Sequence, residues 1–261
     1  MSGYLLDLTG VSLSFAGSRV LDNVDFKVPA SRIISLIGPN GAGKTSLFNC
    51  ITGFYKPQQG SVRFDGTETL KLKPHQVTQL GIARTFQNVR LFREMSVLEN
   101  VMSGQHSRTR AGAIAAILGL PSQRREEAAI RAVAEECLSF VGLTEGWDLD
   151  ATTLPYGWQR RVEIARALAT QPRLLLLDEP AAGLTSGEKE ELIGLIQRIR
   201  GERDVCVLLI EHDTGLVMRL SERVSVLDHG VMIAEGSPKE IQSNPKVIEA
   251  YLGVEEDSLG L

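Results

Sequence analysis

The segment IISLIGPNGAGKTS, residues 33–46, decides how this chain can fold. Its apolar, β-branched start predicts a buried strand, and the glycine-rich stretch that follows predicts a tight loop opening into a helix. Gly38, Gly43, Lys44 and Thr45 satisfy the spacing of a phosphate-binding loop, in which four residues separate a glycine from Gly-Lys-Ser/Thr. We therefore expect this strand, loop and helix to hold the phosphates of a nucleotide.

The residue types in this loop suit a triphosphate. Phosphate oxygens need several N–H donors at close range, and glycine lets the backbone approach them without a Cβ in the way. Lys44 would place a positive charge on the outer phosphates, and the Thr45 hydroxyl would be a ligand for Mg²⁺. The residues predicted to contact the nucleotide here are Gly38, Pro39, Asn40, Gly41, Ala42, Gly43, Lys44, Thr45 and Ser46.

Composition limits the class of protein. The chain has 261 residues, of which 43% are hydrophobic and 23% charged, as in an ordinary globular protein of one large domain or two small ones. A formal net charge of −4 argues against a nucleic-acid partner held by a broad basic surface. The cysteines Cys50, Cys137 and Cys206 have no metal-ligand spacing, so we expect buried thiols in a reducing compartment.

The sequence predicts no membrane-spanning segment. Its first residues carry no basic region followed by a long apolar one, so we expect no signal peptide. The longest weakly polar run, residues 111–120, is about half the length that a helix needs to cross a bilayer. If the protein works at a membrane, other chains must span it.

Patterns along the chain predict an alternating α/β core with two additions. Apolar alternation over residues 4–28 predicts antiparallel strands before the phosphate loop. Helical periodicity over residues 97–140 predicts an inserted helical region, capped by Ser96 and interrupted at Pro121. After it, the fully apolar runs 174–177 and 205–210 are typical of parallel strands buried on both faces.

Polar side chains follow three of the predicted strands. Asp178 and Glu179 come after the run 174–177, His212 follows the run 205–210, and Gln87 ends a strand predicted over 82–87. Because ligands bind at the carboxyl ends of strands in open α/β sheets, we expect these side chains beside the phosphate loop.

On a triphosphate with bound Mg²⁺, each of these four side chains would have a role. Asp178 would help to hold the metal, with Thr45 and Gln87 as further metal ligands. Glu179 is the candidate general base for the attacking water, and His212 would contact the γ-phosphate or that water. Gln87 would reach the metal or the water through its amide, so the predicted catalytic residues are Glu179, His212 and Gln87.

A phosphate loop alone would equally fit a kinase or a GTPase. The stretch LPYGWQRRVEIARAL, residues 154–168, predicts a turn over 154–159 and then a helix, and it lies just before LLLLDEP, residues 174–180. Together these stretches resemble the signature motif and the following strand of the ATP-binding-cassette (ABC) family, and the resemblance extends over about residues 5–252. A kinase would leave the stretch at 154–168 unexplained.

The resemblance implies an architecture. It is an α/β fold: a P-loop NTPase (RecA-like) core with an antiparallel β subdomain and an inserted α-helical subdomain. Residues 1–87 and 170–245 would form the nucleotide-binding core with the β subdomain, and residues 88–169 the helical subdomain. A single ABC ATPase domain would end at residue 253, and residues 254–261 would form a loose tail.

The resemblance also implies roles for single residues. Gln87 is similar to the family's Q-loop glutamine, residues 181–185 to its D-loop and His212 to its switch histidine. Phe15 falls at the position of the aromatic residue that stacks on adenine. The signature residues of one subunit would close on the nucleotide held by another, and here they are Tyr156, Gly157, Trp158 and Gln159.

Further stretches resemble the ATPase subunits of branched-chain amino-acid importers: TGFYKP (52–57), RTFQNVRLFREM (84–95), EPAAGL (179–184) and EAYLG (249–253). That resemblance implies a head-to-tail dimer with an identical or paralogous ATPase subunit, with ATP and Mg²⁺ as cofactors. The dimer would dock on two membrane permeases, fed by a solute-binding protein, at the cytoplasmic face of the inner membrane. Uptake of urea or amides, export of lipids and a non-transport role on ribosomes or DNA stay open as alternatives.

Two departures from the family pattern affect these expectations. Pro155 stands where a small hydroxyl residue is common, and proline offers a phosphate neither a hydroxyl nor an N–H group. The contact would then rest on the backbone of Gly157 and the helix beyond it, next to an unusual Trp158. Thr185 and Ser186 replace the usual Asn or Asp followed by Pro, which puts the coupling between two nucleotide sites in question.

Overall fold

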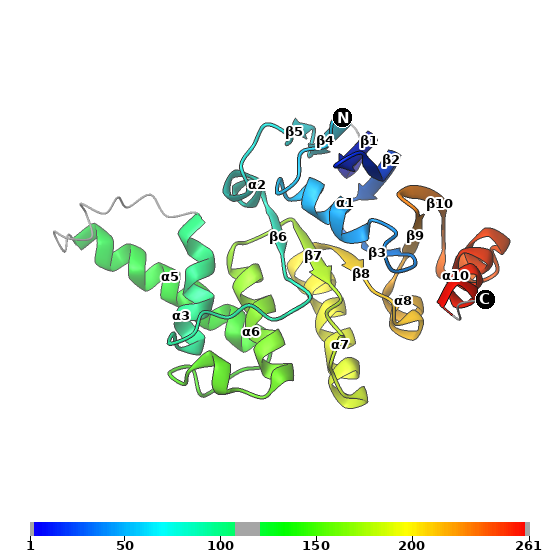
Figure 1. Cartoon of the computed structure of the whole chain (residues 1–261). Helices are drawn as coiled ribbons and strands as arrows, with labels where there is room; N and C mark the ends of the chain where they lie inside the picture. Colours follow the sequence, from blue (N-terminus) through cyan, green and yellow to red (C-terminus); the bar gives the residue numbers. More distant parts are fainter. Residues whose placement is uncertain (1–2, 108–120, 259–261) are drawn as a thin grey trace.

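The computed structural model describes residues 3–107 and 121–258 of the chain. In these residues the core is a six-stranded sheet of order β10-β9-β3-β8-β7-β6 (Figure 1). β3, β7, β8 and β6 run parallel to one another and to β9, and β10 pairs antiparallel with β9 as the second strand of a hairpin. The strands are β3 (Ile33–Ile37), β6 (Ile82–Arg84), β7 (Leu174–Asp178), β8 (Cys206–Ile210), β9 (Arg223–Asp228) and β10 (Val231–Gly236).

The central strands are buried on both faces, which explains their continuous apolar sequence. In β7, Leu174 and Leu176 belong to one hydrophobic core, and Leu175 and Leu177 belong to another on the opposite face. Successive side chains of a strand point to opposite faces, so a strand that lies between two cores needs apolar residues at every position.

A four-stranded antiparallel sheet of order β2-β1-β4-β5 lies beside the first core. Its strands are β1 (Tyr4–Phe15), β2 (Ser18–Pro29), β4 (Gln59–Phe64) and β5 (Thr67–Glu68). The first core lies between this sheet and the parallel one and includes Leu47 and Phe48 of α1 (Lys44–Ile51). The predicted fold class, an α/β core with an antiparallel β addition, is therefore confirmed.

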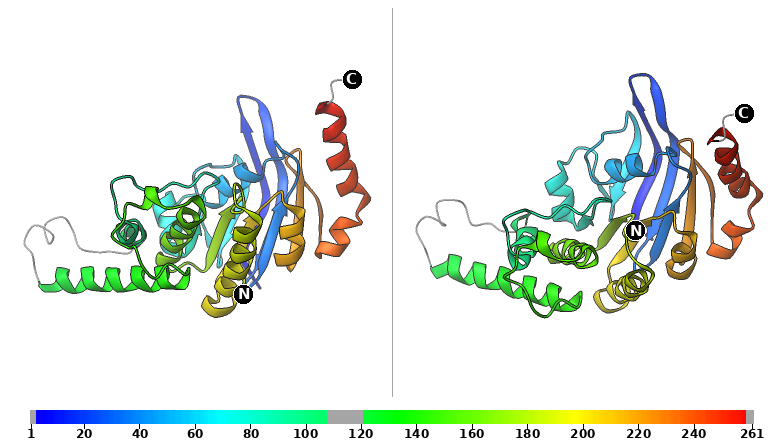
Figure 2. Two further views of the ribbon diagram at one scale, coloured as in Figure 1. Left: turned by 90° about the horizontal axis from the view of Figure 1, so that it is seen from below. Right: turned by 60° about the horizontal axis from the view of Figure 1, so that its bottom comes forward.

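Most of the described helices lie at the two ends of the molecule or beside β8 (Figures 1 and 2). α3, α5 and α6 pack together at one end of the molecule, within the range predicted for the helical subdomain, and α10 lies beside β10 at the other end. α7 and α8 pack on each other next to β8. The bounds are α2 (Pro74–Leu80), α3 (Val97–Met102), α5 (Pro121–Phe140), α6 (Tyr156–Ala169), α7 (Ser186–Arg203), α8 (Thr214–Leu220), α9 (Pro238–Gln242) and α10 (Pro245–Ser258), with 3₁₀ turns η1 (Ser103–Ser107) and η2 (Ala151–Thr153).

Two local expectations are corrected. The strand predicted over 82–87 ends at Arg84, because the N–H of Phe86 bonds to the Glu163 carboxylate instead of a neighbouring strand. α6 begins at Tyr156, because the N–H groups of Trp158 and Gln159 already bond to the Pro155 carbonyl.

α10 continues to Ser258 and so includes the first residues of the predicted tail, 254–261, whose looseness stays a prediction. Val247 and Tyr251, one turn apart, pack on a third core formed with β9 and β10 and anchor this helix. The apolar stretch 111–120 lies outside the described residues. Ser96 caps α3 as predicted, and α5 begins at Pro121, in the first turn, where proline costs little.

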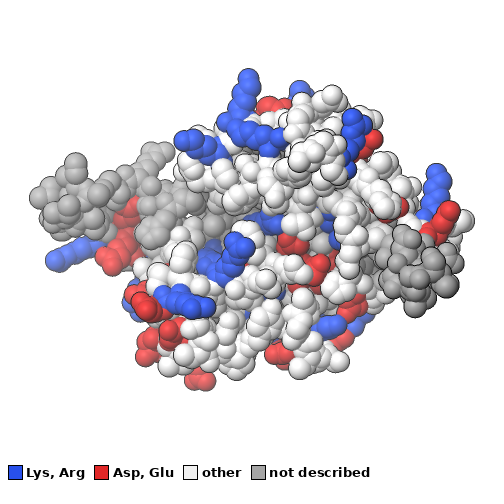
Figure 3. Space-filling view, viewed as in Figure 1, with Lys and Arg blue, Asp and Glu red and all other residues white. Residues whose placement is uncertain are grey.

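The surface carries no broad basic face in the view of Figure 3, where acidic and basic side chains are interspersed. Within residues 3–107 and 121–258, no helix has the length and apolar character to cross a membrane.

Candidate active site

The phosphate loop connects β3 to α1 through a backbone that only glycine fits at two positions. A Cβ on Gly38 would lie 1.9 Å from the Leu227 carbonyl oxygen, and one on Gly43 would lie 2.8 Å from the Val20 oxygen. Gly43 also has a φ of 101°, in the left-handed region. The loop is thus packed against two other strands on its outer side, which leaves its inner side for a ligand.

The start of α1 is suited to an anion. Its first turn has no side-chain cap and no acidic residue, whereas Thr185 caps α7 and Asp213 caps α8. Uncapped N–H groups and the positive end of the helix dipole attract negative charge. The residues of this loop therefore fit the phosphates of a nucleotide.

Lys44 adds a buried positive charge to the loop. Its side chain is folded back, and Nζ donates to the carbonyl oxygens of Gly38 at 2.6 Å and Pro39 at 2.8 Å. Burial lowers the pKa of the Lys44 ammonium, and the nearby carboxylates of Glu179 and Asp178 oppose that shift. A ligand phosphate would replace neutral carbonyl partners with charged ones, which form stronger hydrogen bonds.

The turn after β7 directs a carboxylate at this loop. Glu179 has a φ of 46°, an uncommon conformation for a residue with a side chain, and its N–H bonds to the Ile210 carbonyl at 2.9 Å. Its side chain lines a pocket together with residues 40–46 of the phosphate loop. Such backbone strain is concentrated at functional sites, and here it places the candidate base.

Two side chains from other segments contact the Glu179 carboxylate: Gln87 lies after β6, and His212 lies after β8. Nε2 of Gln87 donates to Oε2 of Glu179 at 2.9 Å, and Nδ1 of His212 lies 3.6 Å from the same oxygen. His212 is open to solvent, with 63% of its side chain exposed. The structure therefore brings together the three residues that were predicted as catalytic, although it does not test their roles.

The three predicted metal ligands line one pocket. Thr45, Gln87 and Asp178 surround it with a hydroxyl, an amide and a carboxylate, which are oxygen donors of the kind that Mg²⁺ binds. In the described part of the chain, no three acidic, His or Cys side chains gather to hold a metal by themselves. Mg²⁺ usually keeps several waters and shares phosphate oxygens, so this sparse set fits it.

Arg84 is a site residue that the sequence analysis missed. Its Nη2 donates to Oδ2 of Asp178 at 2.7 Å and its Nη1 to Oδ1 of Asn49 at 2.6 Å, and each side chain of the Arg84–Asp178 pair is only 6% exposed. The guanidinium lies 5.5 Å from the Phe48 ring centroid and 5.2 Å from that of Phe86. Its signal in the sequence was a charged residue inside a buried strand pattern.

Comparison with known proteins assigns this fold and site to a family. A profile of ABC transporters matches residues 21–182, and a profile of branched-chain amino acid ATP-binding cassette transporters matches residues 231–257. This chain belongs to the ABC transporter family.

The similarity extends over nearly the whole chain. The high-affinity branched-chain amino acid transport ATP-binding protein BraF of Pseudomonas aeruginosa is 46% identical over 253 residues, covering 97% of this chain and 99% of BraF. The ATP-binding cassette MJ1267 in its ADP conformation has a TM-score of 0.83 and 31% identity, over 96% of this chain and 99% of that one. The dimeric post-hydrolysis structure of the cassette MJ0796 with ADP and Pi has a TM-score of 0.75 and 27% identity, over 89% and 98%.

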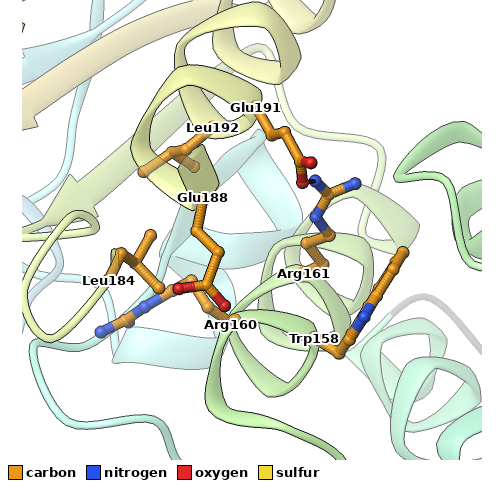
Figure 4. A pocket seen from close by; sticks show the side chains of 8 residues that line it. Trp158, Arg160, Arg161, Leu184, Glu188, Glu191 and Leu192 are labelled. Atoms are coloured by element: carbon orange, nitrogen blue, oxygen red, sulfur yellow. Dashed lines mark hydrogen bonds and ion pairs between the residues drawn. The ribbon is translucent and has the colours of Figure 1, made fainter. Parts of the chain in front are cut away.

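The signature residues of this ABC cassette make contacts away from its own phosphate loop. Tyr156 packs on Gly183, and a Cβ on Gly157 would lie 2.3 Å from Oε1 of Glu188. The guanidinium carbon of Arg161 lies 4.6 Å from the centroid of the Trp158 ring, and the two side chains lie side by side (Figure 4). Gln159 donates to the carbonyl oxygens of Thr152 and Leu154. None of the four residues lines the phosphate-loop pocket, so a role on nucleotide needs a second subunit and stays a prediction.

The altered D-loop keeps its structural role. Thr185 caps α7 by accepting from the N–H of Glu188, and Glu188 in return accepts from the N–H of Thr185 at 2.8 Å. Asn and Asp are good caps for the same reason, so this departure preserves the start of the helix.

The adenine role of Phe15 is not tested by these contacts. Phe15 ends β1, is 44% exposed and packs edge-to-face on Tyr55 with ring centroids 5.0 Å apart. It does not line the phosphate-loop pocket, although Val20 of β2 does.

Replacing Arg84 with methionine should lower the free energy of unfolding by about 3–5 kcal/mol, because Asp178 would stay buried without its counter-ion. Urea denaturation followed by circular dichroism measures this. Adding Asp178→Asn should recover part of the loss. As a control, Arg19→Met removes an exposed pair with Asp22 and should change stability by less than about 1 kcal/mol. An Arg84→Met chain as stable as the parent would contradict the buried-pair argument.

Proposed function

We propose that this chain is the ATP-hydrolysing subunit of an importer that takes up branched-chain amino acids through separate membrane permeases. One observation supports hydrolysis: Gln87 and His212 both lie next to the Glu179 carboxylate, which lines the pocket of the phosphate loop. The substrate class is supported by the printed function of BraF and by the match of the branched-chain amino acid profile to residues 231–257.

The geometry supports an in-line attack of water on the γ-phosphate. The N–H groups of α1 and Lys44 would hold the phosphates, and Glu179 would take a proton from the water as its oxygen bonds to phosphorus and the bond to ADP breaks. Gln87 and His212, both directed at one oxygen of Glu179, would orient that carboxylate and the water. Bound Mg²⁺, held by Thr45, Asp178 and Gln87, would neutralise charge on the outer phosphates.

A head-to-tail dimer would complete the site. α6 begins without a side-chain cap, so we propose that the backbone N–H groups of its first two residues, Tyr156 and Gly157, bond to a phosphate held by another subunit. Tyr156 and Gln159 use their side chains within their own chain, so this contact would be made by the backbone and by Trp158. The dimeric structure of the cassette MJ0796 supports assembly as a dimer.

A groove beside the segment that carries Gln87 supports docking on a permease. Leu91, Phe92 and Ala167 line it together with charged side chains, and Phe92 is exposed. The charged side chains of the lining are Arg84, Arg90, Glu163 and Arg166. We propose that a permease segment occupies this groove and holds the subunit at the cytoplasmic face of the inner membrane. The solute would be recognised by the permeases and a solute-binding protein rather than by this chain.

Lys44→Ala should weaken ATP binding by roughly 10- to 100-fold, because one charge-assisted contact contributes about 1.5–3 kcal/mol. Titration with a fluorescent ATP analogue measures this. Lys239→Ala on the exposed surface of α9 is the control and should bind like the parent. Unchanged affinity for Lys44→Ala would contradict the phosphate-loop assignment.

Glu179→Gln should reduce steady-state hydrolysis on the order of 10²–10⁴-fold and leave ATP affinity within about twofold, because the amide cannot accept the proton. Phosphate release and equilibrium binding give the two values. Glu190→Gln, an exposed carboxylate of α7, is the matched control and should hydrolyse ATP normally. If Glu179→Gln turns over like the parent, Glu179 is not the base.

Reconstitution tests the transport role. The full chain is co-expressed with the reading frames next to its gene and purified. The complex is placed in vesicles that enclose ATP, with a candidate binding protein and labelled leucine or urea outside. We expect accumulation of leucine and none of urea. Accumulation of urea alone would favour the urea alternative, loss of lipid without uptake would favour export, and purification without any permease would favour a non-transport ATPase.

A further inference from the structure

Arg160 is a charged residue that the sequence analysis did not single out and that the structure buries. Its side chain is 1% exposed, in the first turns of α6, one turn after the signature residue Tyr156. Its neighbour Arg161 leaves the helix on another side and pairs with Glu191 (Figure 4). A buried guanidinium is costly unless its N–H groups are bonded, so its partners show what it is used for.

The partners of Arg160 are the backbone of the segment that carries Gln87. Nη1 donates to the Phe86 carbonyl at 2.6 Å, and Nη2 donates to the Gln87 carbonyl at 2.6 Å. Nη1 also donates to Oε2 of Glu163 at 2.7 Å, and Nη2 to the Tyr156 hydroxyl at 3.2 Å. Each of the four Nη hydrogens thus has an acceptor, and two of these acceptors are successive carbonyls of the Q-loop.

Glu163 holds the same segment through its N–H groups. Its side chain is also 1% exposed, and Oε1 accepts from the N–H of Phe86 at 3.3 Å and of Arg90 at 3.4 Å. Burial raises the pKa of the Glu163 carboxyl, and the Arg160 guanidinium opposes that shift. The pair therefore supplies donors and acceptors to a stretch that leaves the sheet after Thr85, whose N–H still bonds to the Leu176 carbonyl of β7.

The same guanidinium connects this segment to the D-loop. Its Cζ lies 5.9 Å from the Tyr156 ring centroid, and that ring packs on Gly183. Arg160 is thus in contact with the backbone that carries Gln87 on one side and with a signature residue that touches the D-loop on the other.

We propose that Arg160 is a positioning residue for hydrolysis, which fixes the backbone at Phe86 and Gln87 so that the Gln87 amide reaches Glu179. The inference rests on the proposed ATPase function. Gln87 projects from an irregular stretch, and its bond to Glu179 can form only while that stretch keeps its place. Lysine would keep the charge opposite Glu163, but a single ammonium cannot bridge two carbonyls, a carboxylate and a hydroxyl in the planar geometry of arginine.

Arg160→Lys is therefore the variant that separates positioning from charge balance. We expect kcat to fall roughly 10- to 100-fold, as for a displaced catalytic group, while KM and ATP binding change less than about twofold. In a Gln87→Ala chain, the same change should lower kcat no further, because Arg160 acts through Gln87. Equal losses in both backgrounds, or an unchanged kcat, would overturn the proposal.

Arg198→Lys is the matched control. Arg198 of α7 also ties a backbone carbonyl, that of Phe140, and a glutamate, Glu202, but far from Gln87 in the chain. Its replacement should leave kcat unchanged.

If Arg160→Lys does not fold, the pair Arg160→Met and Glu163→Gln removes both buried charges together and is measured in the same way.

Hydrogen exchange gives a readout that does not need activity. In Arg160→Lys, the amides of Phe86 and Arg90 should exchange faster than in the parent, while those of the α7 cap near Thr185 should not. Unchanged exchange at 86–90 would overturn the proposal even if the parent hydrolyses no ATP. If the parent hydrolyses ATP and Glu179→Gln does not, the ATPase function stands, and a flat response to Arg160→Lys then counts against this inference alone.

Discussion

The register of three parallel strands determines where the nucleotide site can form. Leu36 of β3 and Asp178 of β7 both pair with Ile210 of β8, so the three strands end level with one another. The segments that follow them, which carry the phosphate loop, Glu179 and His212, therefore emerge at one edge. A slip of one residue would exchange the leucines of β7 between two packed cores, so packing on both faces holds the register in place.

The polar side chains near this edge already have hydrogen-bond partners inside the chain. Lys44 bonds to loop carbonyls, Arg84 to Asp178, and Gln87 to Glu179. A nucleotide would have to displace the partners of Lys44 and share those of Gln87, which is favourable only because phosphate oxygens are charged. The partners keep each side chain in place before the ligand arrives, and preorganisation of this kind lowers the cost of assembling the reactive geometry.

The sequence predicted which residues come together at the strand ends. Glu179 and His212 lie two residues after the apolar runs 174–177 and 205–210, and Lys44 ends the loop that follows the run 33–37. The antiparallel sheet followed from apolar alternation. Arg84 and Arg160 were missed because the sequence does not show which groups their guanidinium N–H donors would bond to, and only tertiary packing decides that both side chains turn inward. The end of β6 and the start of α6 were misplaced for the same reason, since Glu163 and Pro155 take backbone partners that no propensity encodes.

The same helix that would serve a second subunit also holds this chain's own Gln87. The uncapped start of α6 and the guanidinium of Arg160 lie about one turn apart, and a helix moves as a rigid unit over that length. A contact on the first turn of α6 would therefore move the Phe86 and Gln87 carbonyls with it. Pro155 removes one N–H donor from that turn but takes no part in the bonds of Arg160, so the unusual signature would weaken the contact between subunits and leave its connection to hydrolysis intact.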